Sequence, residues 1–437
     1  MSIGESIIGE LIKDKDVISA TIVGSYSENN NIKKIGDLDV VVICKKLTKK
    51  VFLKIISRIN KKKFKIKTII NSSFGPMKIG KENMLPIHVM VYDIESHKEH
   101  VLKSPFTCFD WERSKIYRGK SLKDIFSVNQ LQLNDFTNAR RNSSEYLKDI
   151  NKNKISIRNY KFKGNKVLMN KKFVKIDKRN RGEFVYHIIN FLVINLYKFL
   201  KEKNIKVKGK NFDKLFLKVS NNDKILLKKF KILREKKIKK ALSYEKNILN
   251  LALKFIKYFN DYIKRLKNEY LEINFVRHAA TSLNKKEIFL GTRNNPKIIK
   301  IKKKRINKKK FNYVITSNLL RSKMTGKLYH AQKKLTSNLI TEIDYGKVDG
   351  LTIKQAQKNY PNLFKLWDEG VDAKFPNGEN SNDVKKRVKK FIATLKNFKK
   401  GEKILIVSHS FFLRVLFSFV LKLDLMKVFK IQVDHLK

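Results

Sequence analysis

Three short apolar segments in the last third of the chain each run into polar residues. They are residues 273–276, 313–316 and 404–408, and helix-competent sequence follows each one. β-Branched runs of this length are typical of buried strands, and strands that alternate with helices indicate a layered α/β domain. Because parallel strands end at one edge of a sheet, the polar residues that follow them are expected to lie close together.

The polar residues at these strand ends suit one reaction. Arg277 and His278 follow the first segment, Arg321 follows the second by a short turn, Glu342 comes later, and His409 follows the third. A neutral histidine can attack phosphorus directly and divide phosphate transfer into two steps. Arginines and a second histidine can donate to the phosphoryl oxygens, and a carboxylic acid can protonate the leaving group. Cationic side chains that hold this charge make a metal unnecessary.

This ordered series resembles the histidine-phosphatase superfamily, also called the phosphoglycerate-mutase-like family. The resemblance covers about 160 residues. It implies a three-layer α/β domain that hydrolyses a phosphorylated small molecule without a cofactor, with a phosphatase favoured over a mutase. The roles that it implies are His278 as nucleophile, Arg277, Arg321 and His409 as the phosphate pocket, Glu342 as acid and base, and Asn284 as a phosphate-side contact.

Two positions depart from the family pattern. Ala279 follows the nucleophile where the family usually has glycine, and Asn380 replaces the serine of a Gly-Glu-Ser motif. A glycine beside the nucleophile would suit a tight backbone or a close approach to the ligand. The phosphate pocket is therefore expected to be altered around Ala279.

A second set of polar residues lies near the other end of the chain. Gly24 and Ser25 follow the apolar run 18–23, and Asp37 and Asp39 open another β-branched run. Side chains one residue apart on a strand point to opposite faces and those two apart share a face, so the two aspartates lie together. Such a pair can hold Mg²⁺ against a triphosphate, and a Gly-Ser turn lets the backbone approach the phosphates.

This pattern resembles the polymerase-beta-type nucleotidyltransferase family over roughly residues 15–122. The resemblance implies a small mixed sheet, closed near residues 116–119, and transfer of a nucleoside monophosphate from NTP to an acceptor. The positions that it implies are Gly24 and Ser25 for nucleotide phosphate and Asp37 and Asp39 for Mg²⁺.

The third carboxylate of that family has no clear counterpart. His88 stands about where the acid would align, on a strand over residues 87–92, and Asp93 follows at the strand end. Asp93 could substitute as a metal ligand, and His88 could act as the base or be a packed strand residue. A phosphatase with a catalytically inactive nucleotide-binding or regulatory N-terminal module is therefore the alternative to a bifunctional enzyme.

A chain of 437 residues is too long for one core and predicts an α/β multidomain protein. The expected parts are a nucleotidyltransferase-like domain (1–122), a helical domain (123–270) and a histidine-phosphatase domain (271–437). Apolar residues at three- and four-residue steps predict helices over 183–203 and 244–266. The Lys- and Asn-rich stretch 151–181 is expected to be a loop, and Asn138, Arg140 and Arg141 to form a basic solvated helix face or part of an acceptor pocket.

The net charge of +60 raises a third hypothesis, a basic RNA-binding protein. Lysines are spread along the whole chain rather than clustered, which favours a general compositional bias, although the runs 61–63 and 302–310 could form patches.

Two cysteines give no disulfide framework, so a reducing cytoplasm is expected. No stretch is long and apolar enough for a membrane span. The expected partners are a phosphorylated small molecule and NTP; the oligomeric state, the acceptor and the base stay open.

Overall fold

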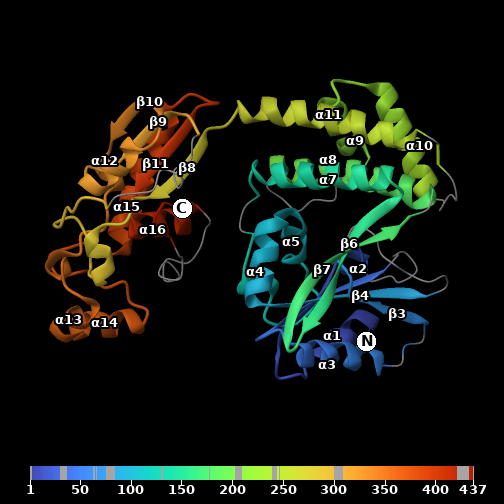
Figure 1. Cartoon of the computed structure of the whole chain (residues 1–437), viewed down its shortest axis with the longest axis horizontal. Coiled ribbons are helices and arrows are strands. Elements are labelled where there is room, and N and C mark those ends of the chain that lie inside the picture. Colours follow the sequence, from blue (N-terminus) through green and yellow to red (C-terminus); the bar gives the residue numbers. More distant parts are fainter. Residues whose placement is uncertain are drawn as a thin grey trace. The chain divides into compact units, whose positions relative to one another are not determined.

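The chain folds into two compact units, residues 1–263 and 264–437, each with its own sheet and core (Figure 1). The structure is a computed structural model. It describes residues 2–29, 37–62, 64, 66–74, 84–128, 131–176, 178–201, 209–238, 244–245, 247–299, 309–420 and 433–436.

The N-terminal unit contains a five-stranded mixed sheet in the order β3-β4-β2-β1-β5. Strand β1 is antiparallel to its neighbours β2 and β5, whereas β2, β4 and β3 are parallel. A small mixed sheet with β5 at its edge was expected from the sequence. The strands are β1 Val17–Val23, β2 Leu38–Cys44, β3 Thr68–Asn71, β4 Leu85–Asp93 and β5 Tyr117–Gly119.

Helices α1 and α3 pack against this sheet through their apolar faces. Ile8 and Leu11 of α1 and Ile55 of α3 are fully buried with the central strands. Helix α1 begins at Ile3 because Ser2 and Glu5 form a reciprocal capping box. The helices around the sheet are α1 Ile3–Leu11, α2 Tyr26–Asn29, α3 Lys49–Asn60, α4 Ile94–Lys103, α5 Pro105–Trp111 and α6 Leu122–Ile125.

The stretch 151–181, expected to be a loop, is instead mostly a β-hairpin of β6 Lys154–Lys163 and β7 Lys166–Lys175. The prediction was wrong because few hairpin side chains are buried, so the sequence carries little hydrophobic alternation. Tertiary contacts hold the hairpin: the hydroxyl of Tyr160 donates to Val91 O and accepts from Val91 N, both at 2.7 Å.

The helical region belongs to the same compact unit as the N-terminal sheet. Phe136 packs against Phe106 of α5 and Phe259 of α11, with ring centroids 4.6 and 5.6 Å away, and Lys198 pairs with Asp110 at 2.6 Å. These contacts join the helices to the elements around the sheet. The helices are α7 Asp135–Asn151, α8 Lys178–Lys201, α9 Lys210–Val219, α10 Lys224–Ile238 and α11 Ile248–Lys267.

The C-terminal unit is built on a four-stranded parallel sheet in the order β10-β9-β11-β8. All three strands expected from the sequence are present. Strand β10 is exposed along most of its length and lacks the apolar pattern of the others. The strands are β8 Glu272–Arg277, β9 Phe311–Thr316, β10 Ala331–Thr336 and β11 Lys403–Ser408.

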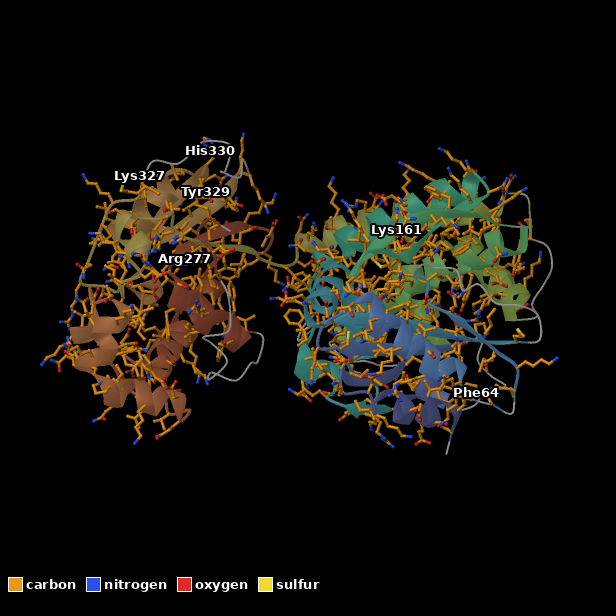
Figure 2. All side chains as sticks on the ribbon, turned by 60° about the horizontal axis from the view of Figure 1, so that its bottom comes forward. Phe64, Lys161, Arg277, Lys327, Tyr329 and His330 are labelled. Atoms are coloured by element: carbon orange, nitrogen blue, oxygen red, sulfur yellow. The ribbon has the colours of Figure 1, made fainter. Side chains whose placement is uncertain are left out.

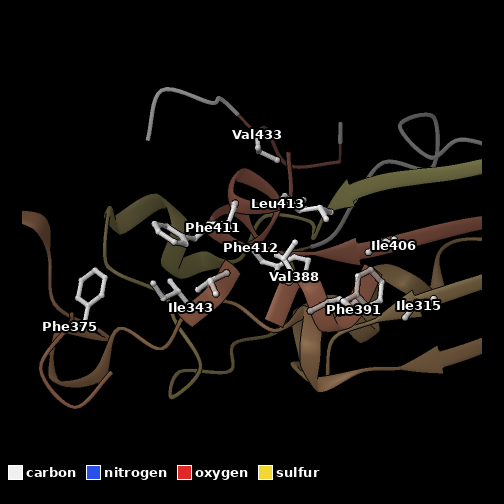
Figure 3. Close-up of a cluster of buried hydrophobic side chains, with 14 of the residues drawn as sticks. Ile315, Ile343, Phe375, Val388, Phe391, Ile406, Phe411, Phe412, Leu413 and Val433 are labelled. Atoms are coloured by element: carbon white, nitrogen blue, oxygen red, sulfur yellow. The ribbon is translucent and has the colours of Figure 1, made fainter. Parts of the chain in front are cut away.

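Both faces of this sheet are buried. On one face Ile315 and Ile406 pack with Val388 and Phe391 of α15 and Phe412 of α16 (Figure 3). Phe311 and Val314 of β9 and Leu405 and Val407 of β11 form a second buried cluster with Tyr329, which lies just after α12. The unit is therefore a layered α/β domain. Its helices are α12 Leu320–Lys327, α13 Ile353–Asn359, α14 Pro361–Asp368, α15 Ser381–Thr394 and α16 Ser410–Val420.

None of the described helices is both long and apolar enough to cross a lipid bilayer.

Candidate functional site

The pairing of β8 with β11 places two histidines side by side. Arg277 is in register with Ser408, and the backbone N–H of His278 donates to Ser408 O at 2.9 Å. His409 follows Ser408 directly, so the ring centroids of His278 and His409 lie 5.0 Å apart. The ends of the first and third predicted strands therefore meet as expected.

The ring of His278 is held with one nitrogen available. Its Nδ1 lies 2.8 Å from Ala279 O, and because a carbonyl only accepts, Nδ1 carries the hydrogen. Burial, followed by the positive charge of Arg321, lowers the pKa of His278 well below its usual value. The imidazole is therefore neutral, with its lone pair on Nε2, which is the form that attacks phosphorus.

Arg321 is fully buried on α12 and is fixed by a loop. Its Nη1 donates to Asn294 O at 3.0 Å, and its Nη2 donates to Gly291 O at 2.8 Å and Leu290 O at 3.3 Å. Within the described part of the chain its Nε is buried and has no hydrogen-bond partner. Three backbone carbonyls thus orient the guanidinium and leave Nε–H unused.

Two more buried nitrogens near His278 lack partners among the described residues. They are Nε of Arg277 and Nδ1 of His409. The Nη1 of Arg277, a residue at the end of β8 (Figure 2), donates to Val433 O at 2.9 Å. Burial is the main cause that lowers the pKa of His409 well below its usual value, and the electrostatic influence of the neighbouring His278 and Arg321 lowers it further. Buried donors normally find a partner, so this group of unused nitrogens points to an anion that they would bind together.

The carboxylate of Glu342 lies at the beginning of α16. It accepts from the backbone N–H of Phe411 at 3.0 Å and of Phe412 at 3.1 Å. A helix N-terminus stabilises a carboxylate. Burial lowers the pKa of Arg277 and Arg321, and the charge of Glu342 opposes that shift, so the carboxylate lies within electrostatic range of both arginines.

The backbone around Glu342 is held by a pair of charges. Arg387 of α15 binds Glu379 through two hydrogen bonds of 2.8 Å. The same guanidinium donates to the carbonyls of Leu339, Thr341 and Glu342, at 2.9, 3.0 and 3.3 Å. Glu379 belongs to the Gly-Glu-Asn motif, so this motif acts by fixing the segment that carries the carboxylate.

The two departures from the family pattern have local explanations. Ala279 is fully buried and is not among the residues with a positive φ, so its backbone does not require glycine. Asn380 caps α15 by accepting from Asp383 N at 3.0 Å, which a serine at the same position would also do.

Asn284 has a local role in this structure. Its Oδ1 accepts from the backbone N–H and the hydroxyl of Thr281, both at 2.8 Å, and caps the short 3₁₀ helix Ser282–Lys286. A contact between Asn284 and phosphate stays a prediction.

Four residues of the site were given no role from the sequence. Ser317 contacts His409, Thr325 accepts from Ala279 N at 2.9 Å, Arg387 holds the segment of Glu342, and His435 contacts His278. Ser317 and Thr325 flank Arg321 in the sequence, which was a usable signal. Arg387 and His435 act across long sequence separations that no local pattern reveals.

In the N-terminal unit, the structure brings Gly24, Asp39 and His88 together. Val23 pairs with Asp39, and Asp39 pairs with His88, on three adjacent strands. Gly24 has φ +73°, and a Cβ on it would lie 2.5 Å from Asp39 Oδ2. The turn thus runs directly over the carboxylate, in a backbone conformation that favours glycine.

His88 occupies the position expected of the third acid, but it is engaged on both sides. Its Nδ1 lies 3.0 Å from Asp39 Oδ1, and its Nε2 contacts Ser73 O. No ring nitrogen is left to take a proton from an acceptor, so the interpretation of His88 as a general base is not supported by the geometry.

Asp93 does not join this group. It pairs with Cys44, five residues further along β4 than His88, and its carboxylate caps α4 through Ser96 N at 2.9 Å. At about 3.3 Å per residue this separation is far beyond a shared metal ion, so the structure corrects the assignment of Asp93 as a metal ligand. The described residues contain no group of three or more His, Cys, Asp or Glu suited to a metal.

Asp37 is buried just before β2, and Ser25 is exposed after Gly24.

Of the two basic runs, residues 63 and 302–308 lie outside the described residues, as do the side chains of Asn138 and Arg140. Long side chains that end in nitrogen extend from both units (Figure 2), in line with lysines spread along the chain.

Residues 273–437 match the family model of the histidine phosphatase superfamily (branch 1). Phosphoserine phosphatase 1 of Hydrogenobacter thermophilus is 24% identical over 175 residues, which are 38% of this chain and 83% of that protein. Fructose-2,6-bisphosphatase of Saccharomyces cerevisiae is 33% identical over 107 residues, which are 24% of this chain and 23% of that protein. The alpha-ribazole phosphatase structure from Shigella flexneri is 20% identical, with a TM-score of 0.32 over 38% of this chain and 86% of that one. The family match does not extend over residues 1–272.

Proposed function

We propose, from the match of residues 273–437 to the histidine phosphatase superfamily and from the geometry of the site, that the C-terminal unit hydrolyses phosphomonoesters through a phosphohistidine. One observation carries the proposal. Arg277 Nε, Arg321 Nε and His409 Nδ1 are buried without partners in the described part of the chain, beside the neutral ring of His278. A phosphoryl group would satisfy all three donors and lie in front of the nucleophile.

The reaction has two displacements at phosphorus. In the first, His278 Nε2 forms the P–N bond while the P–O bond to the leaving group breaks, and the carboxylic acid of Glu342 protonates the departing alkoxide. In the second, the carboxylate of Glu342 takes a proton from water, whose oxygen attacks phosphorus. The P–N bond then breaks, which returns the electron pair to Nε2 and releases inorganic phosphate. Arg277, Arg321 and His409 stabilise the phosphoryl oxygens throughout.

The substrate that we propose is a phosphorylated small molecule. Two relatives are named for phosphoserine and for fructose 2,6-bisphosphate, both small phosphate esters, and this supports the class but selects no member. The cationic side chains carry the charge that a metal would otherwise neutralise, so we propose hydrolysis without a metal cofactor.

A screen over a panel of phosphorylated metabolites tests this function. The full chain should release inorganic phosphate from at least one compound, and His278→Ala should lose all turnover. Release at the wild-type rate by His278→Ala would overturn the proposal, and Ser418→Ala serves as a matched control because its buried hydroxyl makes no hydrogen bond in the described structure.

For the N-terminal unit we propose nucleotidyl transfer from NTP as a second function. The observation that favours it is the close passage of the Gly24 turn over Asp39, which would place backbone N–H groups beside a phosphate chain. Asp37 and Asp39 would hold Mg²⁺, which neutralises triphosphate charge when bound. Ser25 is exposed beside the turn and would donate to the nucleotide phosphate.

A binding or regulatory module without transfer is the competing proposal for this unit. The engagement of both His88 nitrogens supports it, because no base is then available for the acceptor. Labelling of candidate acceptors by radioactive NTP and Mg²⁺, with Asp37→Ala/Asp39→Ala as the control, separates the two. Labelling above the control establishes transfer, whereas nucleotide binding without labelling supports the module.

A further inference from the structure

A third histidine lies against the nucleophile. The Nδ1 of His435 is 2.7 Å from the backbone oxygen of His278, and the two ring centroids are 5.2 Å apart. Because a carbonyl only accepts, Nδ1 of His435 carries a hydrogen and donates it. Nothing in the first strand or its motif points to a residue 157 positions further along the chain.

The short segment that carries His435 extends the parallel sheet beyond β8. His435 forms an isolated parallel bridge with Arg277, and Leu436 N donates to Arg277 O at 3.1 Å. In the same segment Val433 O accepts from Nη1 of Arg277 at 2.9 Å. The segment thus contacts both the phosphate-binding arginine and the nucleophile that follows it.

This contact completes the fixation of residue 278. Its N–H donates to Ser408 O, its ring Nδ1–H donates to Ala279 O, and its carbonyl accepts from His435. Every polar group of the residue except Nε2 is therefore engaged. A nucleophile fixed in this way presents its lone pair in one direction, and small displacements of such a group are costly to the rate.

We infer that His435 is a positioning residue of the C-terminal unit, which holds His278 in line with phosphorus through its Nδ1–H donor. The inference rests on the proposed phosphatase function. Its chemistry is distinct from that of the other two histidines, because His435 neither attacks phosphorus nor donates to the phosphoryl group. It acts through the backbone of His278.

The neutral form of His435 suits this role. Burial and the adjacent Arg277 lower its pKa, while the hydrogen bond to His278 O opposes the shift. A neutral donor fixes the carbonyl without adding another positive charge beside Arg277. Because the neutral ring already carries its hydrogen on Nδ1, the hydrogen bond to His278 O does not require a protonated His435.

Two isosteric substitutions test which ring nitrogen matters. The amide nitrogen of asparagine can occupy the place of Nδ1, whereas that of glutamine reaches the place of Nε2. His435→Asn should keep the rate of phosphohistidine formation from para-nitrophenyl phosphate within about threefold of wild type. His435→Gln and His435→Ala should lower it by about 10- to 100-fold, the range for a misplaced reacting group. The pH profile of kcat should keep its shape in all three, and KM should change less than kcat.

A second measurement does not depend on turnover. In the full chain with ¹⁵N-labelled histidine, nuclear magnetic resonance should report His278 as the single Nδ1–H tautomer in wild type and His435→Asn. The same signal should broaden or shift toward a tautomer mixture in His435→Gln and His435→Ala.

The two measurements keep the outcomes distinct. Wild-type chain that forms no phosphohistidine would refute the phosphatase function, and the tautomer data would still decide the role of His435. Three outcomes would overturn the inference. They are a wild-type rate in His435→Gln but not in His435→Asn, the loss of one limb of the pH profile, and wild-type behaviour of His435→Ala in both measurements. The comparison of asparagine with glutamine stands even if the alanine variant folds poorly, since both replacements are polar amides.

Discussion

The hydroxyl of Ser317 lies 2.7 Å from Nε2 of His409. The backbone N–H of Leu319 donates to the same hydroxyl oxygen at 3.2 Å. Among the described residues the hydroxyl hydrogen has no acceptor other than the imidazole, so the hydroxyl donates to it. Nε2 of His409 therefore accepts, and the hydrogen of the neutral ring is on Nδ1, the buried nitrogen without a partner. Ser317 thus sets the tautomer that a phosphoryl group requires.

Ser317→Ala should lower kcat by about 5- to 10-fold, because one hydrogen bond of ~1 kcal/mol no longer selects the donor tautomer. Steady-state kinetics on para-nitrophenyl phosphate measure the change. Ser418→Ala is the matched control, since that buried hydroxyl has no partner in the described structure. Equal rates for the two variants would show that Ser317 has no part in the site.

Arg387→Met should destabilise the C-terminal unit and reduce its activity together. The guanidinium binds Glu379 and three carbonyls of the segment that carries Glu342, so its loss removes the cation beside Glu379 and the donor to those carbonyls. Both side chains are about a fifth exposed, which reduces the cost to about 1–3 kcal/mol.

Urea unfolding and kcat of Arg387→Met are compared with those of Lys386→Ala. Lys386 neighbours Arg387 on the same helix, but its side chain is 75% exposed in its pair with Asp383. We expect Lys386→Ala to change neither quantity appreciably. An Arg387→Met protein as active as wild type would contradict the role given to the Glu379–Arg387 pair.

Acid should destabilise the N-terminal unit through two histidines. Burial lowers the pKa of His97 and His100 to about 4, from an unfolded value near 6.5. Between these values the unfolded chain binds more protons than the folded one, so the free energy of unfolding falls as pH falls from about 6.5 to 4. Above this window neither state is protonated, and below it the loss is complete, on the order of 3 kcal/mol for each histidine.

Urea unfolding at pH 7 and pH 5 measures this effect. His97→Leu should lose less stability between the two pH values than wild type, because its share of the proton uptake is removed. An identical pH dependence in the variant would show that His97 is not neutral and buried in solution.

Inorganic phosphate should stabilise the C-terminal unit. The unpartnered nitrogens of Arg277, Arg321 and His409 would bind an anion only in the folded state, and a ligand at 100 times its Kd adds about 2.7 kcal/mol. Scanning calorimetry in phosphate and in chloride of equal ionic strength should show a higher Tm in phosphate. Arg321→Lys should lose most of this difference, because lysine cannot supply the Nε–H donor. No difference between the two salts in wild type would contradict an anion site.

The sequence predicted the C-terminal domain well because its signals are local. Strands β8, β9 and β11 carry apolar runs that are buried in β11, largely buried in β9 and half-buried in β8. The residues that follow β8 and β11 meet as strand order requires. Strand β10 is an exposed edge strand without a hydrophobic pattern, so periodicity could not find it. The same reason explains why the β6–β7 hairpin was expected to be a loop.

The sequence could not predict contacts between residues that lie far apart along the chain. Arg387 and His435 contribute to the site through backbone carbonyls, which any sequence can supply, so no motif marks them. Asp93 was assigned to the metal because it ends the right strand, but the register of β4 against β2 places it at the opposite end from Asp39. Asp93 is thus excluded as a partner of Asp39 by its position along the strand and not by its residue type.

The most direct test of the central claim is to trap the phosphorylated enzyme. The full chain is mixed with ³²P-labelled substrate from the metabolite screen, quenched within milliseconds in alkali and analysed by peptide mapping. Because phosphohistidine is stable in alkali and labile in acid, the label should be alkali-stable, located on His278 and absent from His278→Ala. Turnover by wild type without any label on His278, or a label that persists in His278→Ala, would contradict the account.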